Sequence, residues 1–126
     1  MSKRIIATER APRPGGQYSQ GVRWDRIAFT AGQVAIDPMT GQPVAGGVRE
    51  QTRQALRNVR AVVEAAGSDL ASVVKTTCFL ANIDDFPVFD EVYREFFPAD
   101  PPARSTFQVG LVAPWLVEVE AIAVLP

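Results

Sequence analysis

The sequence predicts an α+β fold in which one β-sheet carries two helices on the same face. The strand and helix patterns follow one another in the order strands, helix, strand, helix, strands. The chain has 126 residues, 47% of them hydrophobic, which is enough for one compact domain with a modest core. No repeat, low-complexity tract or long linker divides it. We therefore expect a single domain over residues 1–126.

Short strand patterns occupy the first part of the chain. Residues 3–8 suit a short first strand, and the two prolines and two glycines of residues 10–17 prevent its continuation. Residues 21–24 and 27–36 predict two further strands around a turn at residues 25–26.

A first helix is expected over about residues 48–66, because small and apolar side chains recur there at spacings of three and four. Gly67 follows at the position of a C-terminal cap. The arginines on the outer side of this helix predict a solvated surface. A nucleic-acid patch is the weaker interpretation, because acidic residues are mixed among them.

A β-branched and apolar run at residues 73–80 predicts a central strand. Cys78 lies inside it, and without a histidine to activate it we expect a buried, inert thiol. A second helix is expected over about residues 85–97. Its aromatic stripe predicts core packing, although one of the rings could instead line a pocket.

Two closing strands, residues 103–109 and 117–125, carry charged residues. Alternation in the last strand turns Val117 toward the helices and Glu118 away from them. In the 103–109 strand Arg104 and Thr106 share one side, which we also assign to the face opposite the helices. Apolar residues share that face, and we expect it to pack against other copies of the chain.

Charged groups on such a covered face would be partly desolvated, and therefore paired or functional. The guanidinium of Arg104 matches a substrate carboxylate, and a buried Glu118 can move protons or orient a water. The same pattern also fits a purely structural salt bridge between Arg104 and Glu118 at an interface.

The composition excludes several kinds of site. The chain has no histidine and a single cysteine, so a Ser-His-Asp triad, histidine-ligated zinc and an internal disulfide are all impossible. A net charge of −1 lacks the basic excess of a nucleic-acid-binding protein. No apolar run reaches the length of a membrane span, and the N-terminus lacks the apolar core of a signal peptide, so we expect a cytoplasmic protein.

Several motifs in this order resemble the RidA (YjgF, L-PSP endoribonuclease-like) family over nearly the whole chain. The Pro-Ala-Arg-Ser motif around Arg104 and the Val-Glu-Val-Glu motif around Glu118 are the most specific. The matching segments are Gln17–Gly21, Phe29–Gln33, Gln51–Val59, Val74–Thr77, Pro102–Val109 and Val117–Val124.

The resemblance implies a chorismate-mutase-like domain with a mixed sheet, assembled as a homotrimer whose sheets face the trimer centre and whose clefts lie between subunits. It implies hydrolysis of 2-aminoacrylate and 2-iminobutanoate to 2-keto acids and ammonia, with no metal or cofactor. Arg104 would bind the substrate carboxylate, Glu118 would activate water or transfer a proton, and Tyr18, Gly32 and Thr106 would lie beside the ligand.

Three positions depart from the family pattern. Ala31 replaces a serine of many members, Thr106 replaces a cysteine and Asp90 replaces an asparagine of several. These changes leave the preferred imine open, and an aminomuconate-like acid is one candidate substrate.

The resemblance is also compatible with functions other than deamination. A regulatory trimer could bind small carboxylates in the same clefts without catalysis. Some family members are labelled endoribonucleases or translation inhibitors, and the near-neutral charge of this chain disfavours such an activity. A chaperone-like role is the third possibility that the sequence leaves open.

Overall fold

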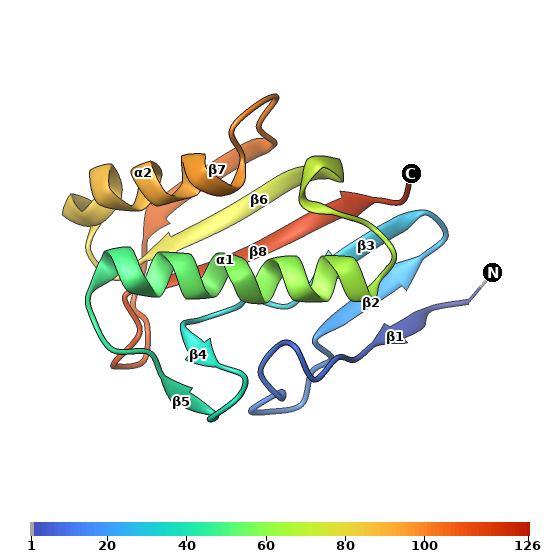
Figure 1. Ribbon diagram of the computed structural model, residues 1–126, viewed down its shortest axis with the longest axis horizontal. Coiled ribbons are helices and arrows are strands. Elements are labelled where there is room, and N and C mark those ends of the chain that lie inside the picture. The colour runs from blue at the N-terminus through green and yellow to red at the C-terminus, as the bar shows by residue number, and fades with distance from the viewer. Residues whose placement is uncertain (1) are drawn as a thin grey trace.

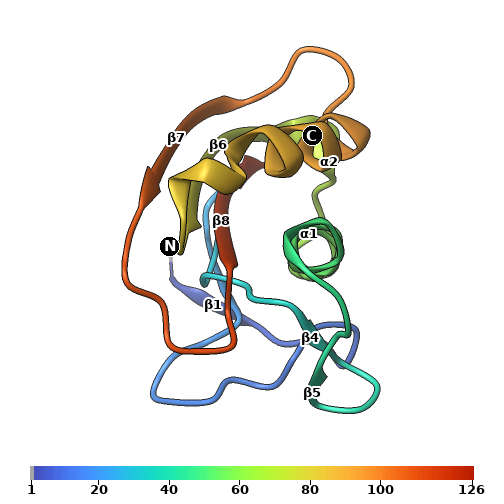
Figure 2. The same ribbon diagram turned by 90° about the vertical axis from the view of Figure 1, so that its left-hand side faces the viewer.

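A six-stranded mixed sheet forms one layer of the molecule, and both helices lie on the same side of it (Figures 1 and 2). The computed structural model describes residues 2–126. Its elements are β1 (Arg4–Ile6), β2 (Gly21–Trp24), β3 (Ile27–Thr30), β4 (Ile36–Asp37), β5 (Gln42–Pro43), α1 (Val48–Ala65), β6 (Val73–Leu80), α2 (Phe86–Phe96), β7 (Ala103–Gln108) and β8 (Val117–Val124), with short 3-10 turns at Leu70–Ser72 and Ile83–Asp85. The predicted α+β fold with two helices on one face is confirmed.

The strand order in the sheet is β1-β2-β3-β8-β6-β7. β6 and β7 run parallel because α2 connects them as a crossover, whereas every other pair in this sheet is antiparallel. The last strand of the chain, β8, therefore lies in the middle of the sheet, and β7 forms an edge. This order decides where charged side chains of β7 and β8 emerge.

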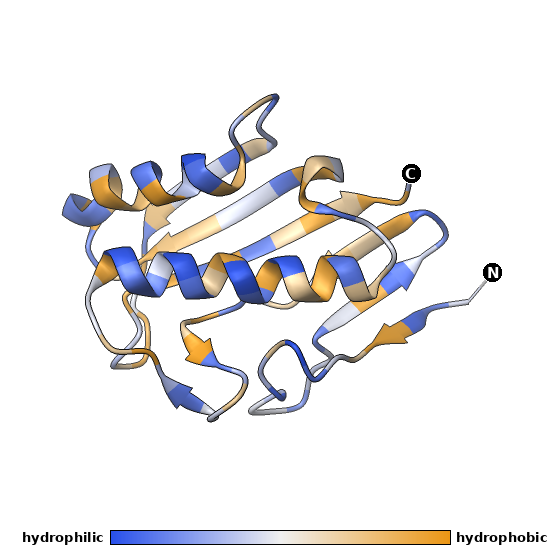
Figure 3. Ribbon diagram, in the orientation of Figure 1, coloured by the Kyte–Doolittle hydropathy of each residue, from blue (hydrophilic) through white to orange (hydrophobic). Residues whose placement is uncertain are grey.

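The main core lies between the helices and the central strands. Leu56 and Val59 of α1 and Phe89 of α2 are fully buried against Val117 and Val119 of β8. In Figure 3 hydrophobic and hydrophilic residues alternate along both helices, and the buried residues of α1 and α2 are mostly the hydrophobic ones. Ion pairs between Arg49 and Glu91 and between Arg53 and Glu95 join the outer sides of the helices.

The helix bounds agree with the sequence patterns to within one residue at either end. The backbone N–H of Gly47 donates to the Glu50 carboxylate at 2.9 Å at the start of α1. Gly67, just beyond its end, has a φ of 95°, a conformation that glycine adopts without strain. No helix within residues 2–126 has the length and apolar character needed to cross a membrane.

The strand predicted over residues 27–36 is wrong in its second half. β3 ends at Thr30, and residues 36–37 instead pair with residues 42–43 in a separate hairpin. The buried Asn58 of α1 explains the change, because its side-chain amide donates to the carbonyls of Val34 and Ile36 at 3.0 and 2.9 Å. These bonds draw the segment out of the sheet and toward the helix.

The sheet face opposite the helices is mixed, as expected for β8. Glu118, Glu120 and Ile122 of β8 point to this face, whereas the intervening Val117, Val119 and Ala121 are buried on the helix side. Neighbouring strands add exposed apolar side chains to this uncovered face. They include Ile27, Phe29 and Phe107, and Val124 at the end of β8 is exposed on the same face. The uncovered face therefore combines exposed apolar area with carboxylates.

Candidate active site

The first group of predicted site residues gathers around Glu118 on the uncovered face. Glu118 lies in β8 opposite Phe79 of β6, and the bridge between Gln33 and Val119 brings the segment after β3 alongside it. Gly32 passes so close that a Cβ placed on it would lie 2.8 Å from the Glu118 carboxyl carbon. Only a residue without a side chain leaves the carboxyl in this position.

Tyr18 completes this group from the loop before β2. Its hydroxyl accepts a hydrogen bond from the backbone N–H of Gly15 at 3.1 Å, and half of the residue is exposed. Tyr18, Gly32 and Glu118 line one hollow of about 540 Å³. Its other walls are Pro12, Arg13, Gly15, Gly16, Gln33, Val34, Ile36, Gly110, Leu111, Val112 and Trp115. The structure thus brings three of the predicted site residues together.

The Glu118 carboxyl is electrostatically poised for proton transfer. Burial raises the pKa of Glu118, and the negative charge of Glu120 raises it further. Within residues 2–126 the Glu118 side chain has no hydrogen-bond or ion-pair partner. A carboxyl with a raised pKa and no bound partner can exchange a proton with water or substrate.

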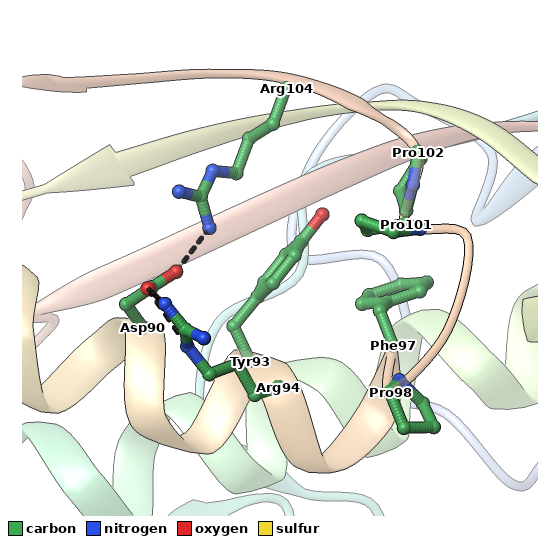
Figure 4. Close-up of a pocket in the computed structure, with 8 residues that line it drawn as sticks. All are labelled: Asp90, Tyr93, Arg94, Phe97, Pro98, Pro101, Pro102 and Arg104. Carbon is green, nitrogen blue, oxygen red and sulfur yellow. Dashed lines mark hydrogen bonds and ion pairs between the residues drawn. The ribbon is translucent and has the colours of Figure 1, made fainter.

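The second group gathers around Arg104 at the edge of the sheet. Arg104 leaves β7 toward α2, where its guanidinium donates to the Asp90 carboxylate at 2.7 Å (Figure 4). Its Cζ lies 4.7 Å from the ring centre of Tyr93 and 5.2 Å from that of Phe86. A hollow of about 430 Å³ opens beside the pair, lined by Asp90, Tyr93, Arg94, Phe97, Pro98, Pro101, Pro102 and Arg104.

Thr106 belongs to the Arg104 group. β7 pairs with β6 so that Arg104 faces Thr76 and Thr106 faces Cys78, both buried on the helix side. The Thr106 hydroxyl oxygen is buried and has no hydrogen-bond partner in the described part of the chain. The neighbouring Cys78 is a buried thiol, as the sequence predicted, and burial raises its pKa to about 11.

The expectation that Arg104 and Glu118 share the uncovered face is therefore wrong for Arg104. Strand alternation fixes which residues lie together but not which side faces the helices. In β7 the side of Arg104 and Thr106 faces α2, where Asp90 supplies a charge partner. Phe107 points the other way and packs edge-on against Phe79, with ring centres 5.2 Å apart.

Sequence reasoning identified Asp90 only as a departure from a pattern and missed its contact with Arg104. It also missed Arg13 and Trp115, which line the Glu118 hollow. The spacing of Asp90 and Arg94, four residues apart in a helix, was the available signal for an acidic anchor there. Within residues 2–126 no three His, Cys, Asp or Glu side chains gather as metal ligands do.

Comparison with known proteins identifies the family of this chain. The model of the family described as Endoribonuclease L-PSP matches residues 8–125. The chain belongs to the RidA (YjgF) family. The E. coli YjgF gene product superposes with a TM-score of 0.91 at 42% identity, covering 96% of this chain and 98% of that one. E. coli TdcF with bound serine superposes with a TM-score of 0.92 at 41% identity, covering 98% and 99% of the two chains.

Curated RidA-family relatives match over nearly their whole length. A human protein named 2-iminobutanoate/2-iminopropanoate deaminase is 43% identical over 98% of this chain and 91% of its own. A RutC family protein of Pyrococcus horikoshii is 46% identical over 96% of this chain and 97% of its own. The RidA fold of this chain thus places Glu118 and Arg104 in two separate groups on opposite faces of the sheet.

Proposed function

We propose that this protein is an imine deaminase that hydrolyses 2-imino acids, with 2-iminobutanoate and the tautomer of 2-aminoacrylate as substrates, to 2-keto acids and ammonia. The observation that carries the proposal is the partly buried Glu118 carboxyl, which has a raised pKa and no partner in the described chain, on the wall of an open hollow. Relatives at 43–46% identity named 2-iminobutanoate/2-iminopropanoate deaminase support the same reaction.

In this proposal the site forms between neighbouring copies of the chain. One copy supplies Glu118, Gly32 and Tyr18, and the next supplies Arg104 and Thr106. The uncovered sheet face supports this arrangement, because its apolar residues and carboxylates need a partner surface. A homotrimer with the sheets facing its centre would repeat the contact three times and close the assembly.

The reaction needs few groups. Arg104 binds the substrate carboxylate through the donors that Asp90 leaves open, and backbone groups of Thr106 lie beside the ligand. Glu118 takes a proton from the attacking water as the new C–O bond forms at C2. The electron pair of the C=N π bond moves to the nitrogen, and Glu118 returns the proton there, which gives the 2-amino-2-hydroxy acid. The hydroxyl proton of this intermediate then passes through Glu118 to the nitrogen, C2=O forms as the C–N bond breaks, and ammonia leaves. An enamine substrate first gains a proton at carbon to become the imine.

Deamination of an imine made in place by a second enzyme tests the proposal. A pyridoxal-phosphate-dependent dehydratase converts threonine or serine to the enamine, and keto-acid release is followed with and without this protein. We expect the protein to accelerate release well above the uncatalysed rate. Equal rates with and without the protein, for both imines, would contradict the proposal.

A further inference from the structure

Asp90 holds two arginines at once. One carboxylate oxygen accepts a hydrogen bond from Arg104 at 2.7 Å, and the other accepts two from Arg94 at 3.1 and 3.2 Å (Figure 4). Arg94 lies four residues further along α2 and is largely exposed, whereas Asp90 and Arg104 are mostly enclosed. The strong contact of Asp90 is therefore the one with Arg104, which comes from a different element.

The remaining contacts of Arg104 fix the plane of its guanidinium. The guanidinium lies over the ring of Tyr93, which is held in place by a 2.7 Å hydrogen bond between its hydroxyl and Thr76. Arg104 stacks on Tyr93 and donates one hydrogen bond to Asp90, and its other nitrogen donors have no partner within residues 2–126. A planar fork held in this way can bind one carboxylate with little further loss of side-chain entropy.

Asp90 also reduces the charge that such a carboxylate meets. The cluster of Arg94, Arg104 and Asp90 has a net charge of +1, and the negative charge of Asp90 lies on the same guanidinium that would bind the ligand. Two carboxylates bound to the same guanidinium repel each other strongly where solvent is partly excluded. A carboxylate therefore binds less tightly beside Asp90 than beside a neutral residue of the same shape.

We propose that Asp90 is a positioning and affinity-setting residue, which holds Arg104 in place while weakening its attraction for the carboxylate that substrate and product share. This inference rests on the proposed deaminase function, in which the 2-imino acid and the 2-keto acid carry the same carboxylate. Binding energy common to substrate and product does not accelerate the chemical step, and it slows product release. Asp90 thus limits inhibition by the keto acid.

Two substitutions separate the two roles. Asp90→Asn keeps an oxygen that accepts from Arg104 but removes the charge, and the exposed Arg94 can turn away from the new amide. Asp90→Ala removes both the negative charge and the hydrogen-bond acceptor for Arg104. Glu91→Gln is the matched control, since it removes one charge from the next position of α2, where Glu91 pairs only with Arg49 in the described chain.

For Asp90→Asn we expect KM and the inhibition constant of 2-oxobutanoate to fall together, by about threefold to tenfold, with kcat not increased. For Asp90→Ala we expect KM to rise and kcat to fall, because Arg104 loses its fixed position. Glu91→Gln should change each constant by less than about twofold. Constants that are unchanged or higher in Asp90→Asn would overturn the inference even if deamination occurs.

Calorimetric titration of each variant with 2-oxobutanoate gives a readout that does not depend on turnover. If the wild type binds this keto acid without deaminating any imine, tighter binding by Asp90→Asn would uphold the inference while the proposed function fails. If no variant binds the keto acid or deaminates an imine, both proposals are overturned.

Discussion

Arg104 and Glu118 project from opposite faces of one β-sheet. Arg104 leaves the edge strand β7 on the helix side and reaches Asp90, whereas Glu118 leaves the central strand β8 on the uncovered side, next to Gly32. The intervening strand β6 pairs with both strands. Two groups so separated can act on one small molecule only if they belong to different copies of the chain, and the proposed function depends on this relationship.

Replacing Arg104 by lysine tests the planar clamp. Lys keeps the positive charge but cannot form two parallel hydrogen bonds or stack on Tyr93, so we expect kcat/KM to fall by about tenfold to a hundredfold. Steady-state kinetics with 2-iminobutanoate measure the loss. The control Arg49→Lys alters an exposed arginine that pairs with Glu91 and should leave kcat/KM unchanged. Equal effects of the two substitutions would argue against a clamp at Arg104.

Glu118→Gln separates catalysis from stability. We expect kcat to fall by about a hundredfold to ten-thousandfold, because the amide cannot transfer protons. Thermal unfolding should show that the same substitution raises the stability of the fold at neutral pH. Since burial raises the pKa of Glu118, its stabilising neutral form is present below the unfolded pKa and is lost as pH rises through the folded pKa.

The variant should therefore be more stable than the wild type at pH 7, by about 1 kcal/mol or less because the side chain is partly exposed. The difference should vanish below about pH 3, where the Glu118 carboxyl is protonated in both the folded and the unfolded chain. A wild type that gains stability relative to the variant as pH rises would show that Glu118 has a favourable charge partner instead.

Gly32→Ala tests the close approach to Glu118. The added Cβ would meet the flexible carboxyl end of Glu118 and not the backbone, so the fold should hold while the carboxyl moves. We expect kcat/KM to fall by about tenfold to a hundredfold with little change in Tm. Gly47→Ala is the matched control, because a Cβ there meets nothing within 4 Å. Full activity in Gly32→Ala would mean that the position of Glu118 does not matter.

Asn58→Ala tests the support of the segment that carries Gly32. The substitution leaves the carbonyls of Val34 and Ile36 without their donor, and we expect the free energy of unfolding to fall by about 2–4 kcal/mol. Urea unfolding measures this loss. Arg57→Ala, on the exposed side of the same helix, should change stability by no more than about 0.5 kcal/mol.

Periodic patterns predicted the fold because the hydrophobic positions of each element agree with its final contacts. The α1 stripe and the alternation of β8 identify their buried faces directly, since both elements contact the core along their whole length. The end of β3 could not be predicted in this way. It depends on hydrogen bonds from Asn58, which is distant in sequence and lies within an otherwise regular helix.

The site was only partly predictable for a similar reason. The residues that the motifs emphasise, Glu118, Gly32 and Tyr18, do line one hollow. The face on which Arg104 lies depends on the pairing of an edge strand and on a partner, Asp90, from a helix, and local alternation contains neither kind of information. The proposed contact between subunits involves a second copy of the chain, so the residue pattern of one strand does not define it.

A mixture of two inactive variants tests the shared site most directly. Arg104→Ala and Glu118→Gln are unfolded together, refolded at equal concentrations and assayed for deamination of 2-iminobutanoate. If neighbouring copies share each site, a random mixture restores one complete pair in about a quarter of the clefts, and about a quarter of wild-type activity should return. A mixture that contains mixed oligomers but remains as inactive as either variant alone would contradict a site built from Arg104 and Glu118 of different copies.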